Sequence, residues 1–257
     1  MQEFTRVCEQ AARAGGDVLL RMRGKINPKE KAPADLVSEA DIGSQEAIRE
    51  LVLAKYPDHA FVGEEDVSPT NNPETAEFTW IVDPLDGTTN YVHGLENYCV
   101  SVALQQGADI VAGCIYDPIR ERAFTATLGM GAFCNSESLQ VSSVTSVSNA
   151  LIAASLPARV EPNSGEVTRF LEVMFRCQAL RRLGSAALNL CYVASGSLDA
   201  YWATSVKKWD VAAGLLLVKE AGGIVSNIDG SPIDIEKPWF VVSAQEALHR
   251  EMVSILT

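Results

Sequence analysis

Two carboxylates lie close together at the end of an apolar run in the first half of the chain. Trp80–Val82 has the composition of a buried strand, Asp83 follows it directly, and Asp86 comes three residues later. Gly87 and Thr88 then have the composition of a turn that enters a helix. Carboxylates bind hard cations such as Mg²⁺, and the free N–H groups at a helix start bind phosphate. The pattern therefore predicts metal-assisted chemistry on a phosphate.

Glu64 and Glu65 form a second acidic pair, directly after a short predicted strand over residues 60–62. If that strand lies beside the Trp80–Val82 strand, four acids crowd one end of a sheet. Like charges in a partly desolvated site raise one another's pKa, and a divalent cation removes the repulsion. Taken alone, however, the acids at 64–66 are better interpreted as a surface loop.

The stretch from Asp83 to Gly87 could likewise form only a tight turn, because Asp, Pro and Gly are turn formers. Pro84 has no N–H to donate, so we expect it to end the strand. A plain turn rarely needs the Thr-Thr-Asn sequence that follows at residues 88–90. Hydroxyl and backbone groups there can hold a metal-bound water and a phosphate together, so we favour a functional role.

Several other candidate residues have structural interpretations that suffice alone. Ser38 and Asp41 have the spacing of a capping box, and Asp210 has the position of a helix cap worth ~1 kcal/mol. The small residues 184–187 fit the approach of a ligand and simple helix packing about equally well. Two basic pairs could meet a substrate phosphate, although such pairs are more often solvated: Arg181-Arg182 and Lys207-Lys208.

Composition limits the possible functions. The chain of 257 residues is 47% hydrophobic and 21% charged, as in soluble globular proteins, and its net charge of −12 argues against binding nucleic-acid polymers or anionic membranes. Six scattered cysteines without a C-x-x-C pair predict reduced thiols, and three separated histidines disfavour a His-rich metal site. The start lacks the pattern of a secretory signal, and no apolar run approaches the roughly 20 residues of a membrane span. We expect a cytoplasmic protein whose carboxylates carry the chemistry.

Helices and strands occur in mixed order, which predicts a layered α+β fold rather than a doubly wound sheet. Helices are predicted over residues 3–23, 38–55, 166–176, 185–195, 209–220 and 244–256. Further strands are predicted over residues 98–104, 110–116 and 123–127 as a meander, and over 150–155, 198–202 and 239–242. We expect an exposed loop over residues 24–34. The Ser- and Val-rich stretch 141–149 predicts a boundary between halves 1–145 and 146–257, the first carrying most of the candidate metal ligands and the second supplying Asp210 and residues on the substrate side.

Together these motifs resemble the inositol monophosphatase family, a branch of the lithium-sensitive, Mg²⁺-dependent phosphatase superfamily. The resemblance covers essentially the whole chain. It rests on residues 35–41 (DLVSEAD), 63–65 (GEE), 80–90 (WIVDPLDGTTN), 209–214 (WDVAAG) and 220–223 (EAGG).

The resemblance implies roles for individual residues. The metal ligands for two or three Mg²⁺ ions would be Glu64, Asp83, the Leu85 carbonyl, Asp86 and Asp210. The residues around the attacking water would be Glu64, Asp41 and Thr88, with support from Glu65. The substrate-binding residues would be Asp86, Gly87, Thr88, Gly184, Ser185, Ala186 and Asp210, with the backbone N–H groups of Gly87 and Thr88 on the phosphate.

The resemblance also implies an αβαβα sandwich, a homodimer, and hydrolysis of a small phosphorylated polyol, with inositol 1-phosphate as the first candidate. Animal members have a Glu that contacts inositol hydroxyls seven residues before the Asp matching Asp210, and Ala203 stands there in this chain. Substrate preference can change when such a partner is lost. Histidinol phosphate, a sugar phosphate and a 3′-phosphonucleotide are therefore alternatives. A non-catalytic regulator that binds phosphate ligands is the alternative from another class.

Overall fold

The computed structural model describes residues 1–25, 29–32, 35–66, 70–157 and 159–257. Its helices are α1 (Gln2–Met22), α2 (Glu39–Lys55), α3 (Thr88–Val92), α4 (Gly165–Arg176), α5 (Ala186–Ala194), α6 (Lys208–Glu220) and α7 (Glu246–Leu256). Its strands are β1 (Lys29–Ala32), β2 (Asp35–Val37), β3 (Ala60–Gly63), β4 (Phe78–Asp86), β5 (Cys99–Gln106), β6 (Asp109–Asp117), β7 (Arg122–Thr127), β8 (Ala132–Cys134), β9 (Glu137–Ser138), β10 (Leu151–Ser155), β11 (Ala179–Arg181), β12 (Ala200–Ala203), β13 (Ile224–Asn227) and β14 (Phe240–Ser243).

The large sheet has the strand order β3-β4-β5-β6-β7-β8-β9. β3 and β4 are parallel, and every later pair is antiparallel. The meander predicted over residues 98–127 is therefore confirmed. The two acid-bearing strands are neighbours, which was the condition for the predicted crowding of acids. Because β3 and β4 run in the same direction, the residues that follow them emerge at the same edge of the sheet.

The small sheet has the order β11-β10-β12-β14-β13 and is also mixed. β10 is parallel to both β11 and β12, whereas β14 is antiparallel to β12 and β13. β11 and β13 were not predicted, because runs of three and four residues without clear alternation carry little periodic signal.

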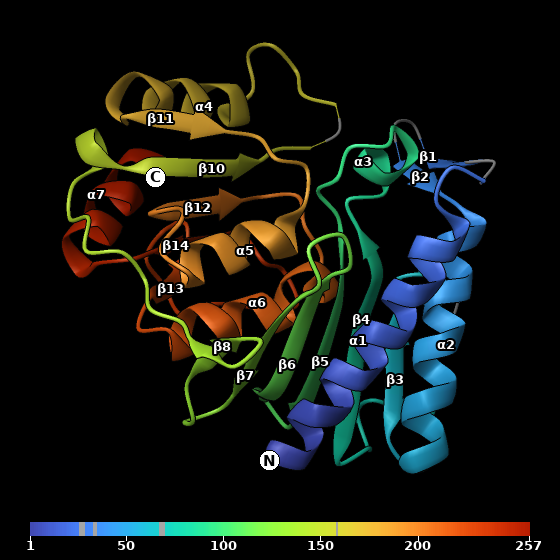
Figure 1. Ribbon diagram of the computed structural model, residues 1–257. Helices are drawn as coiled ribbons and strands as arrows, with labels where there is room; N and C mark the ends of the chain where they lie inside the picture. Colours follow the sequence, from blue (N-terminus) through green and yellow to red (C-terminus); the bar gives the residue numbers. More distant parts are fainter. Residues whose placement is uncertain (26–28, 33–34, 67–69, 158) are drawn as a thin grey trace.

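Helices and sheets alternate in five layers (Figure 1). α1 and α2 cover the outer face of the large sheet, α5 and α6 lie between the two sheets, and α4 and α7 cover the small sheet (Figure 1). This is the predicted α+β sandwich.

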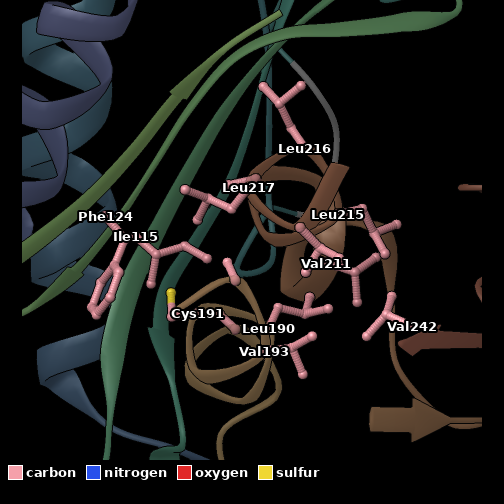
Figure 2. Packing of buried hydrophobic residues seen from close by; sticks show 14 of the residues in the cluster. Ile115, Phe124, Leu190, Cys191, Val193, Val211, Leu215, Leu216, Leu217 and Val242 are labelled. Carbon is pink, nitrogen blue, oxygen red and sulfur yellow. The ribbon is translucent and has the colours of Figure 1, made fainter. Parts of the chain in front are cut away.

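The central helix layer explains why α5 and α6 are apolar on nearly every side. Figure 2 shows Leu190 of α5 and Leu217 of α6 between Ile115 of the large sheet and Val242 of the small sheet. A helix that is covered on both faces needs no polar stripe. α1, by contrast, has one buried face and one exposed face, which matches its place at the outside of the molecule.

Two local predictions were wrong. The stretch 24–34 was expected to be a loop, but Lys29–Ala32 forms β1, which pairs with β2; residues 26–28 and 33–34 lie outside the described residues. Pro84 does not end β4, which continues to Asp86. Its missing N–H is tolerated because β3 pairs only as far as Val82 and the β5 register shifts between Asp83 and Asp86.

The six cysteines are free, and four of them are buried. Within the described ranges, every helix falls short of the length or the apolarity that crossing a membrane requires.

Candidate metal and phosphate site

Three carboxylates converge at the edge where β3 and β4 end. Glu64, Asp83 and Asp210 each offer an oxygen, and these oxygens all lie within 4.8 Å of one another. Glu64 directly follows β3, Asp83 lies in β4, and Asp210 is in the first turn of α6. The cluster thus unites residues that are 146 positions apart in the chain (64 to 210). Glu65 and Asp86, which were also expected in an acidic cluster, lie outside this trio among the described residues.

The turn that carries Glu64 is held by α2. Gln45 of α2 accepts a hydrogen bond from the Glu65 N–H at 3.0 Å, and its side-chain amide donates to Asp66 at 3.0 Å. A Cβ at Gly63 would lie 2.2 Å from the Gln45 side-chain oxygen, so glycine is required for this close approach. The Glu64 N–H in turn donates to the Val82 carbonyl at 3.1 Å, which fixes the turn against β4.

The irregular end of β4 gives its two acids different partners. The Asp83 side chain accepts the Leu85 N–H at 3.0 Å, and the Pro84 carbonyl accepts the Ser44 hydroxyl of α2 at 2.8 Å. The Asp83 side chain therefore lies beside Glu64 and Asp210, and the backbone bends around it. The Asp86 carboxylate lines the same cavity and contacts the start of α5.

Asp86 binds the beginning of α5. Its carboxylate accepts the backbone N–H groups of Ala186 at 3.2 Å and Ala187 at 2.8 Å, and the Ser185 hydroxyl also donates to it. The buried Cys99 thiol lies 3.7 Å from the same carboxylate. A carboxylate at a helix N-terminus is stabilised by the free N–H groups and the helix dipole. Asp86 thus joins the large sheet to the central helix layer.

Thr88 links two predicted site residues at the start of α3. Its hydroxyl lies 3.2 Å from the Asp41 carboxylate and 3.0 Å from the Leu85 carbonyl. Asp41 also accepts the Ser38 N–H at 2.8 Å, so the predicted capping box is present. A hydroxyl has one proton and two lone pairs, which leaves Thr88 able to accept a hydrogen bond from a water.

Two glycines allow the α3 start to approach α5 closely. Gly87 caps α3 with φ of 96°, and a Cβ there would lie 3.3 Å from the Gly184 carbonyl oxygen. Gly184 has φ of 81°, and a Cβ there would lie 2.8 Å from the Asn90 side chain. Positive φ is a region that side chains other than glycine rarely adopt. Glycine is therefore required at both positions for this close packing.

Asp210 is held by its own helix start. It accepts the Lys207 N–H at 2.8 Å, as the predicted capping role requires, and the same side chain still reaches the trio. One carboxylate has two oxygens, so the structural and functional interpretations of Asp210 are compatible.

The surroundings of the site raise the pKa values of two of its carboxylates, Asp83 and Asp210. Burial raises the pKa of Asp83 well above its usual range, and the charges of Glu64 and Asp86 raise it further. The pKa of Asp210 is raised by burial and by the same two charges. A divalent cation supplies the charge that would let these groups ionise together. The trio of carboxylate oxygens, the ligand type that Mg²⁺ prefers, therefore fits a metal site.

A cavity of 650 Å³ contains this chemistry. Its lining includes these predicted site residues: Glu64, Asp83, Leu85, Asp86, Gly87, Thr88, Gly184, Ala186 and Asp210. Asp41 and Ser185 lie behind the wall and are buried. A larger neighbouring cavity of 830 Å³ is lined by Lys237 and Trp239 and contains none of the trio, so volume alone does not identify the site.

Sequence reasoning missed several supporting residues. Asn90 and Asn97 donate to the Leu183 carbonyl at 2.9 and 3.0 Å, which ties the α3 segment to the residues before α5. The contact between Cys99 and Asp86 was also not anticipated. Partners 86 to 93 residues apart leave no periodic signal. Only the Thr-Thr-Asn sequence at 88–90 gave a hint, through Asn90.

An αβαβα sandwich that brings clustered carboxylates beside a helix start is the architecture of the sugar-phosphatase-type fold. The chain belongs to the inositol monophosphatase family, whose sequence profile matches residues 1–257.

Individual relatives agree with this membership. The chain is 38% identical over 251 residues to an inositol-1-monophosphatase of Mesorhizobium japonicum, covering 96% of this chain and 93% of that one. It is 36% identical over 247 residues to Nus factor SuhB of Pseudomonas aeruginosa, covering 94% and 91%. Among solved structures, the extragenic suppressor protein suhB from Bartonella henselae superposes with a TM-score of 0.93 at 35% identity, covering 99% and 98%.

Proposed function

We propose that the chain is a Mg²⁺-dependent phosphomonoesterase that hydrolyses a small phosphorylated polyol, with inositol 1-phosphate as the first candidate. The observation that supports this most is the trio of Glu64, Asp83 and Asp210, whose oxygens lie within 4.8 Å of one another in the same cavity as Gly87 and Thr88. Acids alone would repel a phosphate. Acids that hold divalent cations beside free N–H groups attract one.

The proposed roles follow from the contacts. The carboxylates of the trio, with Asp86 and the Leu85 carbonyl, would hold two or three Mg²⁺ ions. Bound Mg²⁺ supplies Lewis acidity to the phosphoryl oxygens and lowers the pKa of a bound water. The backbone N–H groups of Gly87 and Thr88 would bind the phosphate.

The attacking water has its own proposed partners. Glu64, Thr88 and Asp41 would orient it, since the Thr88 hydroxyl lies 3.2 Å from Asp41 and retains an acceptor lone pair. Glu65 would support this arrangement. No side chain is assigned a covalent role, so hydrolysis would be a direct in-line displacement.

Release of inorganic phosphate from inositol 1-phosphate, with Mg²⁺ and with a chelator, tests the proposal. We expect turnover only with Mg²⁺ and at least a 10³-fold loss, roughly the effect of losing a catalytic metal ligand, in Asp83→Asn. Asp109→Asn changes an exposed acid at the far start of β6 and serves as the matched control with unchanged activity. Full activity of Asp83→Asn would refute the mechanism.

The choice of alcohol is the less constrained part of the proposal. Ala203 is buried and offers only a methyl group where animal members have a Glu. A panel of inositol 1-phosphate, histidinol phosphate, sugar phosphates and a 3′-phosphonucleotide would rank the substrates. Strong use of another ester beside weak turnover of inositol 1-phosphate would correct the substrate and leave the reaction type intact.

Other features are proposed from family membership: a homodimer, inhibition by Li⁺, and a cytoplasmic location. Sedimentation measures the first, inhibition of phosphate release by LiCl against KCl measures the second, and fractionation measures the third. The proposed halves 1–145 and 146–257 would be tested by limited proteolysis, with cleavage expected near residues 141–149.

The name Nus factor SuhB of a 36% identical relative supports a second candidate function, a non-catalytic role as a factor that binds another protein. An exposed apolar group on α4 adds to this: Leu171, Met174 and Phe175, the last 77% exposed. The net charge of −12 argues against direct binding to RNA. If the factor role is the principal one, Asp83→Asn will lose phosphatase activity and still replace the wild-type protein in the cell.

A further inference from the structure

The cavity of the proposed active site contains a cation that the metal and phosphate roles do not use. The described residues that line the cavity include the carboxylates and a single basic side chain, Arg182. Arg182 lies in the segment between β11 and α5, whereas the carboxylates come from β4, the residue after β3 and the start of α6. The reacting phosphate already has partners in the proposed metal ions and in the N–H groups of Gly87 and Thr88. Arg182 is therefore an additional charge.

The guanidinium of Arg182 is not engaged elsewhere in the described part of the chain, where no hydrogen bond or ion pair is made by it. Its neighbour Arg181 is also exposed, but ends β11 outside the cavity and donates to the Leu180 carbonyl at 3.0 Å. Of these two adjacent and exposed arginines, only Arg182 lines the cavity.

The backbone beside Arg182 is firmly held. The Leu183 carbonyl accepts hydrogen bonds from Asn90 at 2.9 Å and Asn97 at 3.0 Å. Two residues after that, Ser185 donates to Asp86. The Arg182 side chain therefore projects from a fixed point close to the phosphate-binding turn, and only its own rotamers are free. A cation held in this way loses little additional freedom when it binds a ligand.

The wall around Arg182 does not oppose an anion. The lining residues other than the predicted site residues and Arg182 are apolar or hydroxyl-bearing: Ala154, Ser155, Leu156, Pro157, Ser205 and Val206. Ala203, buried behind them, carries no charge where a Glu would repel a second anionic group. Two divalent cations would neutralise the four carboxylates of the cavity, which would leave the charge of Arg182 without an acidic partner among the described lining residues.

We propose that Arg182 is a specificity-determining residue, which binds a second anionic group, a phosphate or a carboxylate, on the alcohol portion of the substrate. The inference rests on the proposed phosphatase function and extends it to esters of anionic alcohols. A guanidinium is suited to this task because its planar fork matches both carboxylate and phosphate oxygens.

Pairs of esters that differ in one anionic group provide the test. Fructose 1,6-bisphosphate is compared with fructose 1-phosphate, and 3-phosphoglycerate with glycerol 3-phosphate, in the Mg²⁺-loaded wild type and in Arg182→Ala. Arg181→Ala is the matched control. We expect Arg182→Ala to raise KM about tenfold for the ester with the second anion, as for loss of one partly exposed charge-assisted hydrogen bond, and kcat to change little. KM for the partner ester and both constants of Arg181→Ala should change less than about twofold.

Arg182→Lys should restore part of the lost affinity, because it keeps the charge without the planar fork. An equal rise of KM for both members of a pair would assign Arg182 to the reacting phosphate and overturn the inference. The inference would also be overturned if, in both pairs, the wild type had no lower KM for the ester with the second anionic group. The two pairs distinguish phosphate from carboxylate as the second group.

Calorimetric titration separates this inference from the proposed function. If the wild type releases phosphate neither from inositol 1-phosphate nor from the four esters, the phosphatase proposal fails, and binding alone decides the role of Arg182. Binding of fructose 1,6-bisphosphate that weakens about tenfold in Arg182→Ala, but not in Arg181→Ala, supports the inference. Equal binding by all three proteins overturns it.

Discussion

Replacing Asp83 by Asn should make the metal-free protein more stable while it inactivates the enzyme. Asn keeps the shape of the side chain and can still accept the Leu85 N–H, which lies 3.0 Å from Asp83. It removes the charge of the most buried member of the trio, 1% exposed, and thereby its repulsion with Glu64 and Asp210. The substitution therefore changes electrostatics with little change in packing.

The size of the effect follows from the separation of the charges. Carboxylate oxygens within 4.8 Å repel by about 1 kcal/mol in water and about 4 kcal/mol at an effective dielectric constant of about 20. Protonation of Asp83, whose pKa is raised, relieves part of this cost at about 1.4 kcal/mol per pKa unit. We expect a net gain of about 2 kcal/mol at pH 8, or about 4–8 °C in Tm for a chain of this size.

The sign of the pH dependence is fixed by the direction of the pKa shift. Below the ordinary pKa of an Asp, both the folded and unfolded wild-type chains carry the proton, and Asp83 costs nothing. As pH rises toward the raised pKa of the folded state, the unfolded chain loses its proton first, so the wild type loses stability. Asn does not titrate. The Tm advantage of Asp83→Asn should therefore be small near pH 4 and grow toward pH 8.

Thermal unfolding in a chelator and in Mg²⁺ provides the assay. At 100 times its Kd, a ligand that binds only the folded state adds about 2.7 kcal/mol, so Mg²⁺ should make the wild type the more stable protein again. Asp117→Asn is the control: this buried acid is paired with Arg120 at 3.0 Å and Arg122 at 3.4 Å, and its loss should lower Tm in both buffers. A lower Tm for Asp83→Asn in chelator, or equal Mg²⁺ stabilisation of both proteins, would refute the reasoning.

Three further outcomes are expected. Ser185→Ala removes a donor to the buried Asp86 and should lower Tm by about 2–8 °C, measured by calorimetry, because an under-satisfied carboxylate costs about 1–2 kcal/mol. Thr88→Val removes the hydroxyl that contacts Asp41 and is proposed to orient the attacking water, and should lower kcat about 10²-fold or more, measured by phosphate release, while Thr88→Ser retains most activity. Gly87→Ala forces a side chain into φ of 96° and should destabilise the protein by about 1–2 kcal/mol and weaken competitive inhibition by inorganic phosphate. An unchanged value in any of these measurements contradicts the corresponding contact.

The sequence predicted elements with a long periodic pattern well. α1 was expected over residues 3–23 and extends over Gln2–Met22, and α6 was expected from residue 209 and begins at Lys208. Local signals indicated the convergence of acids, because Glu64 and Asp83 each follow a short apolar run, but it depended on the pairing of the two strands, which the structure provides. Short segments therefore carried enough information to predict much of the fold and the position of the acidic cluster.

The remaining features depend on contacts between distant segments. Asp86 was expected beside Asp83, yet its carboxylate accepts N–H groups from α5, about 100 residues further along the chain. Nothing near residue 86 in the sequence encodes that choice. The continuation of β4 through Pro84 was missed for a related reason, since the penalty of a missing N–H depends on whether a neighbouring strand needs it.

The link between Asp86 and the start of α5 has a consequence for how the protein loses its function. Asp83 belongs to the large sheet and Asp210 to the central helix layer, so the trio exists only while those layers remain in register. A partly denatured molecule whose layers have separated would keep every helix and strand and still lack the constellation. In a denaturant titration, the disappearance of Mg²⁺-dependent activity would then report the separation of layers, ahead of the loss of far-ultraviolet circular dichroism. Activity would therefore measure the packing of the layers, which far-ultraviolet circular dichroism does not detect.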